Sequence, residues 1–343
     1  MHNQYTPKNL KLPKDNILEK NDKKGILPYV FTDAITVAID VSLATNRPLL
    51  VSGNPGCGKS RLADAVAALQ DWNLLSCIIT SRTRIDTLTA EVDQLRRLND
   101  AHIGRLGNND DQQTSRPGRP DAYYLNPGIF WWAFDANSAR CRGLTEEQAN
   151  DHQALLSYPG TERSQKAGVV LLIDEIDKAE PDLPNDLLDP LDRRRFPLPP
   201  GFRACRDGKK RTVIKAPPEK DLALLTIITT NGERELPQAF LRRCVLLEIT
   251  DPTKEELVKI ATLHSPDDNR VRIEKIAERL VKFREIAKKQ RVRAPGVAEL
   301  LDAVHACREL GIEVDDSDSE KSVWSHLQRA VLAKDPAFRA RRS

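Results

Sequence analysis

Residues 53–60 combine three glycines with a lysine and a serine in the order Gly-Asn-Pro-Gly-Cys-Gly-Lys-Ser. This order satisfies the pattern G-x-x-x-x-G-K-[ST], and it lies between an apolar run at 48–52 and a segment with helical spacing at 61–70. Glycines let backbone N–H groups turn toward phosphate oxygens, and the N-terminus of a following helix adds partial positive charge. We therefore expect Lys59 to reach the β- and γ-phosphates of ATP and Ser60 to give its hydroxyl oxygen to Mg2+.

The whole loop and the residue after it form the expected nucleotide-binding set. Its members are Gly53, Asn54, Pro55, Gly56, Cys57, Gly58, Lys59, Ser60 and Arg61. Cys57 is interpreted as a spacer, because a redox role would need a partner cysteine and none is visible. The alternative for the whole motif is a glycine-rich turn without function, which the flanking strand and helix disfavour.

Two acidic residues, Asp174 and Glu175, end a second apolar run at 169–173. The carboxyl ends of parallel strands meet at one edge of a sheet, so this pair is expected beside the glycine-rich loop. Phosphoryl transfer needs two carboxylate roles, and we assign Asp174 to Mg2+ through its water shell and Glu175 to the attacking water. Taken alone, the pair could instead cap a helix, but together with the loop it favours ATP hydrolysis.

Polar residues also follow the apolar run at 224–229. Asn231 lies where a side chain can orient the same water and sense the γ-phosphate; the alternative is an asparagine that starts a turn before Gly232. Farther along, Arg242 and Arg243 carry permanent charge and can bridge two phosphate oxygens. One of them is predicted to stabilise the transition state from the neighbouring subunit.

Short apolar runs, rich in leucine and β-branched residues, must position these side chains. Runs with so little polar alternation are typical of a parallel sheet covered by helices on both faces. The predicted strands are 48–52, 75–79, 169–173, 224–229 and 245–249. Helical periodicity predicts helices at 33–46, 61–70, 85–99 and 182–194. The alternation of strands and helices indicates an α/β layered fold.

The periodicity divides the chain into three parts. Residues 1–28 are polar, show neither helical nor strand periodicity, and are predicted to form a flexible arm. Residues 29–252 hold all the motifs above and form the predicted nucleotide-binding domain. Residues 253–343 show helical periodicity only and form a predicted C-terminal helical domain. Two polar stretches, 107–121 and 313–322, are expected to be loops.

Composition disfavours several classes of protein. The 343 residues are 40% hydrophobic and 30% charged, without an apolar run that could span a membrane or form a signal peptide, so we expect a cytoplasmic protein with no membrane insertion. The six cysteines include no C-x-x-C pair, which disfavours zinc and disulfides. A net charge of +3 disfavours a dedicated nucleic-acid binder. The basic runs 193–195 and 209–211, near a predicted hairpin, are interpreted as solvated or inter-subunit charge.

The order of these motifs resembles the AAA+ superfamily and, within it, the MoxR-like ATPases. The resemblance covers about residues 29–310 and depends on the loop (Walker A), LLIDEIDKAEPDLPNDLLDPLDRRRFPLP (with Walker B), TIITTNGERELPQAFLRRC and PGIFWWAF. It implies an αβα core with strand order 5-1-4-3-2, a helical lid, and a ring, commonly a hexamer, with ATP between subunits. It also matches Asn231 to sensor 1 and Arg243 to the arginine finger, with Arg242 as the fallback.

The chain departs from that family in two places. Many relatives have a sensor 2 arginine at the start of a lid helix, but residues 291–296 read Arg-Val-Arg-Ala-Pro-Gly, so that arginine is displaced or absent. The stretch 135–167 is longer than the resemblance implies and is interpreted as an insertion.

Residues 123–134 hold six of the seventeen aromatic residues, and two interpretations stay open: a client-binding surface, or a hairpin packed on the core. The resemblance implies a chaperone-like ATPase that remodels or loads a partner protein, often together with a von Willebrand factor A domain protein. One alternative is a nucleotide-dependent switch or scaffold that exchanges ATP and ADP, including one in a bacterial conflict or defence system. Another is a DNA-associated motor or loader.

Overall fold

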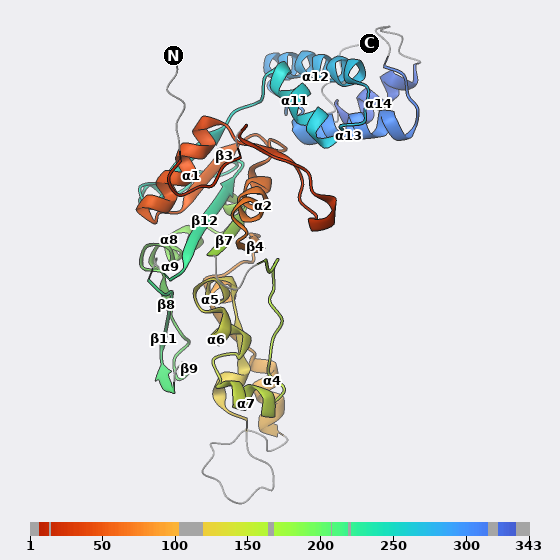
Figure 1. Cartoon of the computed structure of the whole chain (residues 1–343). Coiled ribbons are helices and arrows are strands. Elements are labelled where there is room, and N and C mark those ends of the chain that lie inside the picture. Colours follow the sequence, from red (N-terminus) through yellow and green to blue (C-terminus); the bar gives the residue numbers. More distant parts are fainter. Residues whose placement is uncertain are drawn as a thin grey trace, which may run out of the picture. The chain divides into compact units, whose positions relative to one another are not determined.

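The computed structural model (Figure 1) describes residues 7–13, 15–102, 119–163, 168–206, 208–218, 221–314 and 322–333. The chain divides into two units, which we describe separately. Unit 1 comprises Met1–Val37, Val51–Leu69 and Leu247–Ser343, and unit 2 comprises Ala38–Leu50 and Gln70–Leu246. Most of the predicted loops at 107–121 and 313–322 lies outside the described residues.

A five-stranded sheet has the order β13-β3-β12-β7-β4. Its strands are β3 (Leu49–Gly53), β4 (Asn73–Ile78), β7 (Gly168–Asp174), β12 (Ala223–Thr230) and β13 (Val245–Ile249). Counted along the chain, this is the predicted order 5-1-4-3-2, and all five predicted strands are present. β7 pairs in parallel with both β12 and β4. Six of its seven residues are buried, which explains why its sequence is an unbroken apolar run.

Helices α1 (Asp33–Thr45) and α2 (Lys59–Gln70) confirm two of the predicted helices. α2 buries a face of small and branched residues at helical spacing. These residues are Leu62, Ala63, Ala65, Val66 and Ala67. Because α2 begins at Lys59, its N-terminal N–H groups belong to the glycine-rich loop.

The single helix predicted at 85–99 is wrong. The segment forms α3 (Ile85–Leu88), β5 (Ala90–Val92) and α4 (Gln94–His102), because β5 pairs with the antiparallel strand β6 (Leu125–Pro127). Gly128, directly after β6, donates its N–H to the carbonyl of Thr89 at 2.8 Å. This long-range pairing outweighs a local helical preference.

The helix predicted at 182–194 is divided into α8 (Leu183–Asp186) and α9 (Leu188–Arg193). Pro190 has no N–H to donate to the carbonyl of Asp186, so the helical hydrogen-bond ladder is interrupted there. After α9, β8 (Arg195–Pro197) pairs with β11 (Val213–Lys215), and β9 (Ala204–Arg206) pairs with β10 (Lys209–Arg211), both antiparallel. The predicted hairpin is therefore present (Figure 1).

The stretch interpreted as an insertion begins with two helices and has no helix from 152 to 163. η2 (Asp121–Tyr124) and α5 (Ile129–Phe134) lead into α6 (Ala136–Arg140) and α7 (Glu146–Asp151). A capping box between Thr145 and Gln148 fixes the start of α7. Together these elements contribute many side chains to the hydrophobic core of unit 2.

In unit 1, the described residues after β13 form four helices: α11 (Lys254–His264), α12 (Arg270–Gln290), α13 (Val297–Glu309) and α14 (Val323–Val331). Leu257, Ile276, Leu280 and Leu300 are fully buried in their shared core. The predicted arm, residues 1–28, includes β1 (Ile17–Leu18) and η1 (Asp22–Lys24), and β1 pairs with β2 (Tyr29–Val30), which follows the arm. In the described part of the chain, none of the helices is both long enough and apolar enough to cross a membrane.

Candidate functional site

The glycine-rich loop lies between β3 and α2 and depends on backbone angles that only glycine adopts easily. Gly53, Gly56 and Gly58 have φ angles of +150°, +82° and +96°. A Cβ atom on Gly53 would also lie 2.5 Å from the carbonyl oxygen of Ile249. The loop geometry therefore favours glycine at 53 and 58, where the motif pattern requires it, and also at 56, where the pattern allows any residue.

The ammonium of Lys59 folds back over this loop. Its Nζ donates to the carbonyl oxygens of Gly53 at 2.7 Å and Asn54 at 3.1 Å, and only 7% of the residue is exposed. The loop offers hydrogen-bond donors suited to an oligophosphate. They are the backbone N–H groups of a loop with three glycines, the Lys59 ammonium, and the N–H groups at the start of a helix. The residues present therefore fit a nucleoside triphosphate.

Cys57 is buried within the loop, and burial raises the pKa of its thiol, although nearby Lys59 opposes this. A thiol with a raised pKa is a poor nucleophile, which agrees with the interpretation of Cys57 as a spacer. Asn54 extends outward instead, and its Nδ2 donates to Asp251 Oδ2 at 2.9 Å.

The first turn of α13 contacts the same loop. The N–H groups of Val297 and Ala298 lie 3.1 and 3.3 Å from the carbonyl oxygen of Gly56. Gly296 lies so close that a Cβ atom would be 3.0 Å from the carbonyl oxygen of Pro55. Glu299, only 6% exposed, accepts a hydrogen bond from the N–H of Gly296 at 2.9 Å.

These contacts bear on the expected sensor 2 position. At the start of α13 the chain has Gly296, while the side chain of Arg293 is 58% exposed and lies 3.4 Å from Glu299. A different arginine is half-buried nearby: Arg284 of α12 donates to the carbonyl oxygens of Pro252 and Pro295 at 2.8 and 2.9 Å. Burial lowers the pKa of Arg284, and Asp251 opposes this. The sequence analysis predicted a role for neither Arg284 nor Glu299; the carbonyl partners of Arg284 lie 11 and 32 residues away, which local patterns do not reveal.

In unit 2, the acidic pair at the end of β7 is held by a threonine of the neighbouring strand. The Thr229 hydroxyl donates to Asp174 Oδ1 and accepts from the N–H of Glu175 at 2.9 Å. Glu175 itself has a φ of +61°, a strained value for a residue with a side chain. Thr229 is thus a positioning residue that the sequence did not identify as one.

The carboxylate of Glu175 has two side-chain partners. Asn231 Nδ2 lies 3.4 Å from its Oε1, and Lys178 Nζ lies 2.6 Å from its Oε2. This hydrogen bond to Glu175 raises the pKa of Lys178. The structure thus brings Asn231 to the predicted catalytic carboxylate, and it adds a lysine that the sequence analysis did not consider.

A buried carboxylate, Asp177, holds the loop that carries Asn231. Its Oδ2 accepts from the backbone N–H groups of Asn231 and Glu233, both at 3.0 Å, and the residue is 2% exposed. The position of the sensor loop therefore depends on a residue two positions after Glu175. The run Asp-Glu-Ile-Asp contains this third acid, but the sequence alone gave it no role.

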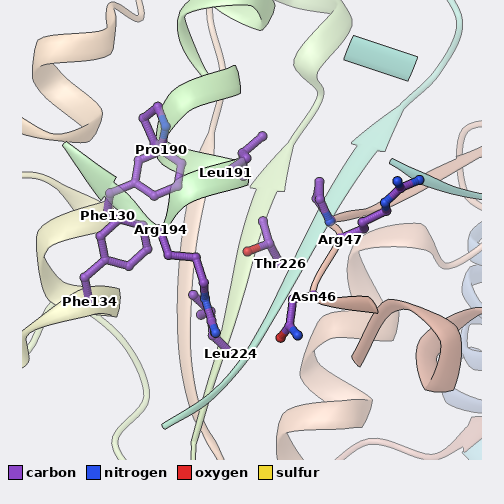
Figure 2. A pocket seen from close by; sticks show the side chains of 10 residues that line it. Asn46, Arg47, Phe130, Phe134, Pro190, Leu191, Arg194, Leu224 and Thr226 are labelled. Atoms are coloured by element: carbon purple, nitrogen blue, oxygen red, sulfur yellow. The ribbon is translucent and has the colours of Figure 1, made fainter. Parts of the chain in front are cut away.

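Two pockets of unit 2 differ in what they could hold. One, of about 470 Å³, is lined by Ile78, Ile79, Thr80, Ser81, Glu175, Asp177, Lys178, Glu233 and Arg234. The other (Figure 2), of about 10 Å³, is lined by Asn46, Arg47, Pro48, Phe130, Phe134, Pro190, Leu191, Arg194, Leu224 and Thr226. The second is barely large enough for one water molecule. Of these two pockets, the larger one, which includes Glu175, has room for a ligand.

The two candidate finger arginines follow α10 (Gln238–Leu241) and differ in their surroundings. Arg243 forms an ion pair with Asp192 and donates to the carbonyl of Ala239 at 2.9 Å. Arg242 is exposed and has no ion-pair partner in the described part of the chain. Arg242 is thus the less constrained of the two, whereas Arg243 would have to leave Asp192 to reach another subunit.

The aromatic segment is not a surface that could grip a client. Its six aromatic side chains are between 0 and 8% exposed and belong to the core of unit 2: Tyr123, Tyr124, Phe130, Trp131, Trp132 and Phe134. The client-binding interpretation is therefore wrong. The segment is also not a hairpin, since its tryptophans lie on α5, where Trp131 packs edge to face on Phe196.

Comparison with known proteins agrees with this geometry. The family model for the AAA domain (dynein-related subfamily) matches residues 48–244, which include the glycine-rich loop, Asp174, Glu175, Asn231 and both arginines. A search of curated proteins gives no match.

Proposed function

The chain belongs to the AAA domain family (dynein-related subfamily), and from that premise we propose that it is a Mg-dependent ATPase of the MoxR-like type. The observation that best supports hydrolysis is the position of Glu175, at the end of β7 and 3.4 Å from Asn231. A carboxylate and an amide at neighbouring strand ends are suited to orient one water for in-line attack.

In this proposal the glycine-rich loop binds the phosphates. Lys59 would exchange its contacts with the loop carbonyls for the β- and γ-phosphates, while the loop N–H groups would donate hydrogen bonds to other phosphate oxygens. Ser60 and Asp174 are the residues that would hold Mg2+, which supplies charge neutralisation on the phosphate oxygens. Thr229 keeps Asp174 in place through its hydroxyl.

Glu175 would take a proton from the attacking water. Asn231 orients the carboxylate through Oε1, and Asp177 fixes Asn231 through its backbone N–H. Lys178 occupies Oε2 at 2.6 Å and so competes with water for one carboxylate oxygen. We infer that the contact between Lys178 and Glu175 loosens during turnover.

Ring assembly is also part of the proposal. AAA domains typically assemble so that an arginine of one subunit reaches the nucleotide of the next, and we assign this role to Arg243, with Arg242 as the alternative. Arg242 is exposed, and Arg243 forms an ion pair within its own chain, so each arginine can be tested separately as the finger. A ring, commonly a hexamer, would remodel or load a partner protein, including a von Willebrand factor A domain protein.

The second candidate function is a nucleotide-dependent switch or scaffold with slow turnover. The aromatic segment is buried in the core, so it cannot serve as a client-binding surface. This favours the switch function over a chaperone-like ATPase that remodels a client. The two functions differ in whether a partner protein raises the ATPase rate.

The deciding experiment replaces Glu175 by glutamine and compares it with Glu180→Gln, an exposed glutamate five residues later. Glu175→Gln removes the general base but keeps the side-chain shape, so we expect ATP binding to persist while kcat falls about 100- to 10,000-fold. Glu180→Gln should hydrolyse ATP like the wild type. Full activity of Glu175→Gln would contradict the assigned mechanism.

A further inference from the structure

A dense group of basic residues lies on the two hairpins after α9. Residues 193–215 contain nine lysines and arginines and one acidic residue, in a chain whose net charge is only +3. The ATPase proposal gives these residues no role. We call the β8–β11 and β9–β10 pairs the basic hairpins (Figure 1).

The pleat of the basic hairpins separates apolar from charged side chains. Phe196, Ile214 and Ala204 are buried in the core of unit 2. Arg195 and Lys215, the cross-strand pair next to the buried pair Phe196 and Ile214, are exposed. Because side chains alternate along a strand, the fold places these charges on the solvent face.

Several of these charges face one another across the strands. Arg195 is opposite Lys215, and Arg206 is opposite Lys209. Like charges at directly opposed positions destabilise a strand pair. Arg206 has a carboxylate partner in Asp135, so the repulsion that a bound polyanion would reduce is the one between Arg195 and Lys215.

Arg193 and Arg206 are cations of this group that have carboxylate partners inside unit 2. Arg193 pairs with Asp189 at 3.2 Å, and Arg206 pairs with Asp135 at 2.8 Å. Six others are exposed and form no ion pair with a carboxylate in the described part of the chain. They are Arg195, Arg203, Lys209, Lys210, Arg211 and Lys215.

The surroundings of these six cations indicate the kind of anion. Phe196 and Phe202 are buried, and Val213, at 38% exposure, is the large hydrophobic side chain exposed on the described hairpin strands. Protein interfaces have aromatic anchors at their centre and few lysines, so an acidic protein is a poor fit. A nucleic-acid backbone offers a continuous row of phosphates and needs no such anchor.

We propose that the basic hairpins bind the phosphodiester backbone of nucleic acid without recognising base sequence. Exposed lysines and arginines neutralise phosphates, and binding is driven by release of condensed counterions. No aromatic side chain is exposed on the described hairpin strands, so stacking on bases has no platform there. Affinity should therefore depend on salt and charge density and hardly on sequence.

The test measures binding of the full chain to labelled duplex DNA by fluorescence anisotropy, without nucleotide, so that the result does not depend on ATP hydrolysis. If six cations each neutralise a phosphate, affinity should fall about 1,000-fold between 50 and 200 mM salt. The variant Lys209→Gln/Lys210→Gln/Arg211→Gln should bind more weakly and lose only about 40-fold over the same range. The same measurement with single-stranded DNA and with RNA identifies which nucleic acid binds with the highest affinity.

A matched control removes the same charge elsewhere. Lys288, Lys289 and Arg291, at the end of α12, are exposed cations of unit 1. Their glutamine triple variant should keep the wild-type affinity and salt dependence. An equal loss in both triple variants would show that net charge, and not the basic hairpins, determines binding, and would overturn the proposal.

A second variant separates binding from misfolding. Arg195→Gln removes one side of the like-charge pair with Lys215, so it should raise the thermal unfolding temperature slightly while weakening DNA binding. A damaged fold cannot produce both changes. Absence of DNA binding at 50 mM salt, or binding of poly-glutamate in preference to nucleic acid, would overturn the proposal and favour an acidic protein partner.

Discussion

At the scale of single residues, the candidate site depends on a layer of side chains behind the catalytic carboxylate. Thr229 joins Asp174 to Glu175, and Asp177 binds the loop of Asn231 through two backbone N–H groups. Asp177 is 2% exposed, so its charge is stabilised by those bonds and not by water. We therefore regard Asp177 as a positioning residue, since no reacting atom is assigned to it.

Asp177→Asn tests this role. Loss of the charge weakens two charge-assisted hydrogen bonds, so we expect the free energy of unfolding to fall by about 2–3 kcal/mol. Because Asn231 would lose its position, kcat should also fall while the KM for ATP stays close to the wild-type value. Thermal unfolding and steady-state ATPase assays measure both effects.

The control for this variant is Asp182→Asn, an exposed acid on the same segment. It should change neither stability nor kcat. If Asp177→Asn lost stability but kept its kcat, Asp177 would be a structural residue without influence on catalysis.

At the scale of elements, the start of α13 is joined to the glycine-rich loop by main-chain contacts. Val297 and Ala298 donate to Gly56, and Gly296 approaches Pro55 closely. Where the family resemblance implies an arginine side chain, this chain therefore has backbone in contact with the loop. Movement of α13 and the conformation of the loop must be coupled, because the same carbonyl oxygen of Gly56 accepts both bonds.

Gly296→Ala tests this coupling. The new Cβ would lie 3.0 Å from the carbonyl oxygen of Pro55 and 3.1 Å from the backbone of Gly56, so either the loop or α13 must shift. We expect kcat/KM for ATP to fall about tenfold, corresponding to about 1.4 kcal/mol. Nucleotide affinity by calorimetry and steady-state kinetics measure the change.

Asp302→Ala, an exposed substitution on the same helix, serves as the comparison and should leave nucleotide affinity unchanged. Wild-type nucleotide affinity and kinetics in Gly296→Ala would mean that the contact between α13 and the loop has no part in nucleotide binding.

At the scale of the whole molecule, the proposed active site needs a second copy of the chain. Arg242 and Arg243 lie directly after α10, and Arg243 is held by Asp192 of its own chain. A permanent positive charge can serve a neighbouring nucleotide only if subunits assemble. A result that contradicts assembly therefore also contradicts the arginine-finger proposal.

Mixed subunits test both. Lys59→Ala subunits cannot bind ATP well, and Arg243→Ala subunits lack the proposed finger, so each alone should be nearly inactive. A mixture should recover part of the activity, because an intact Lys59 site can lie next to an intact Arg243. The ATPase rate of the mixture and its mass by light scattering, with and without Mg-ATP, are the measurements.

Mixtures with Arg242→Ala in place of Arg243→Ala identify which arginine acts. Recovery with only one of them assigns the finger to that residue. If no mixture recovers activity and the protein stays monomeric with Mg-ATP, action between subunits is contradicted and the switch function gains support.

The local features of this protein could be predicted from its sequence. The glycine-rich loop is defined by backbone angles that its own residues impose, and each core strand is an apolar run that must be buried. The family resemblance then supplied the strand order, which the structure confirms. The predicted domain boundaries at 28 and 252 stay predictions.

Only the tertiary structure decided the features that depend on distant partners. Ala90–Val92 is a strand and not part of a helix, because β6 offers it backbone partners more than thirty residues later in the chain. The aromatic segment is core because the sheet and β8 cover it, and Asp177 has a role because the loop after β12 returns to it. Local propensity cannot reveal such contacts, since their free energy arises only when separate segments meet.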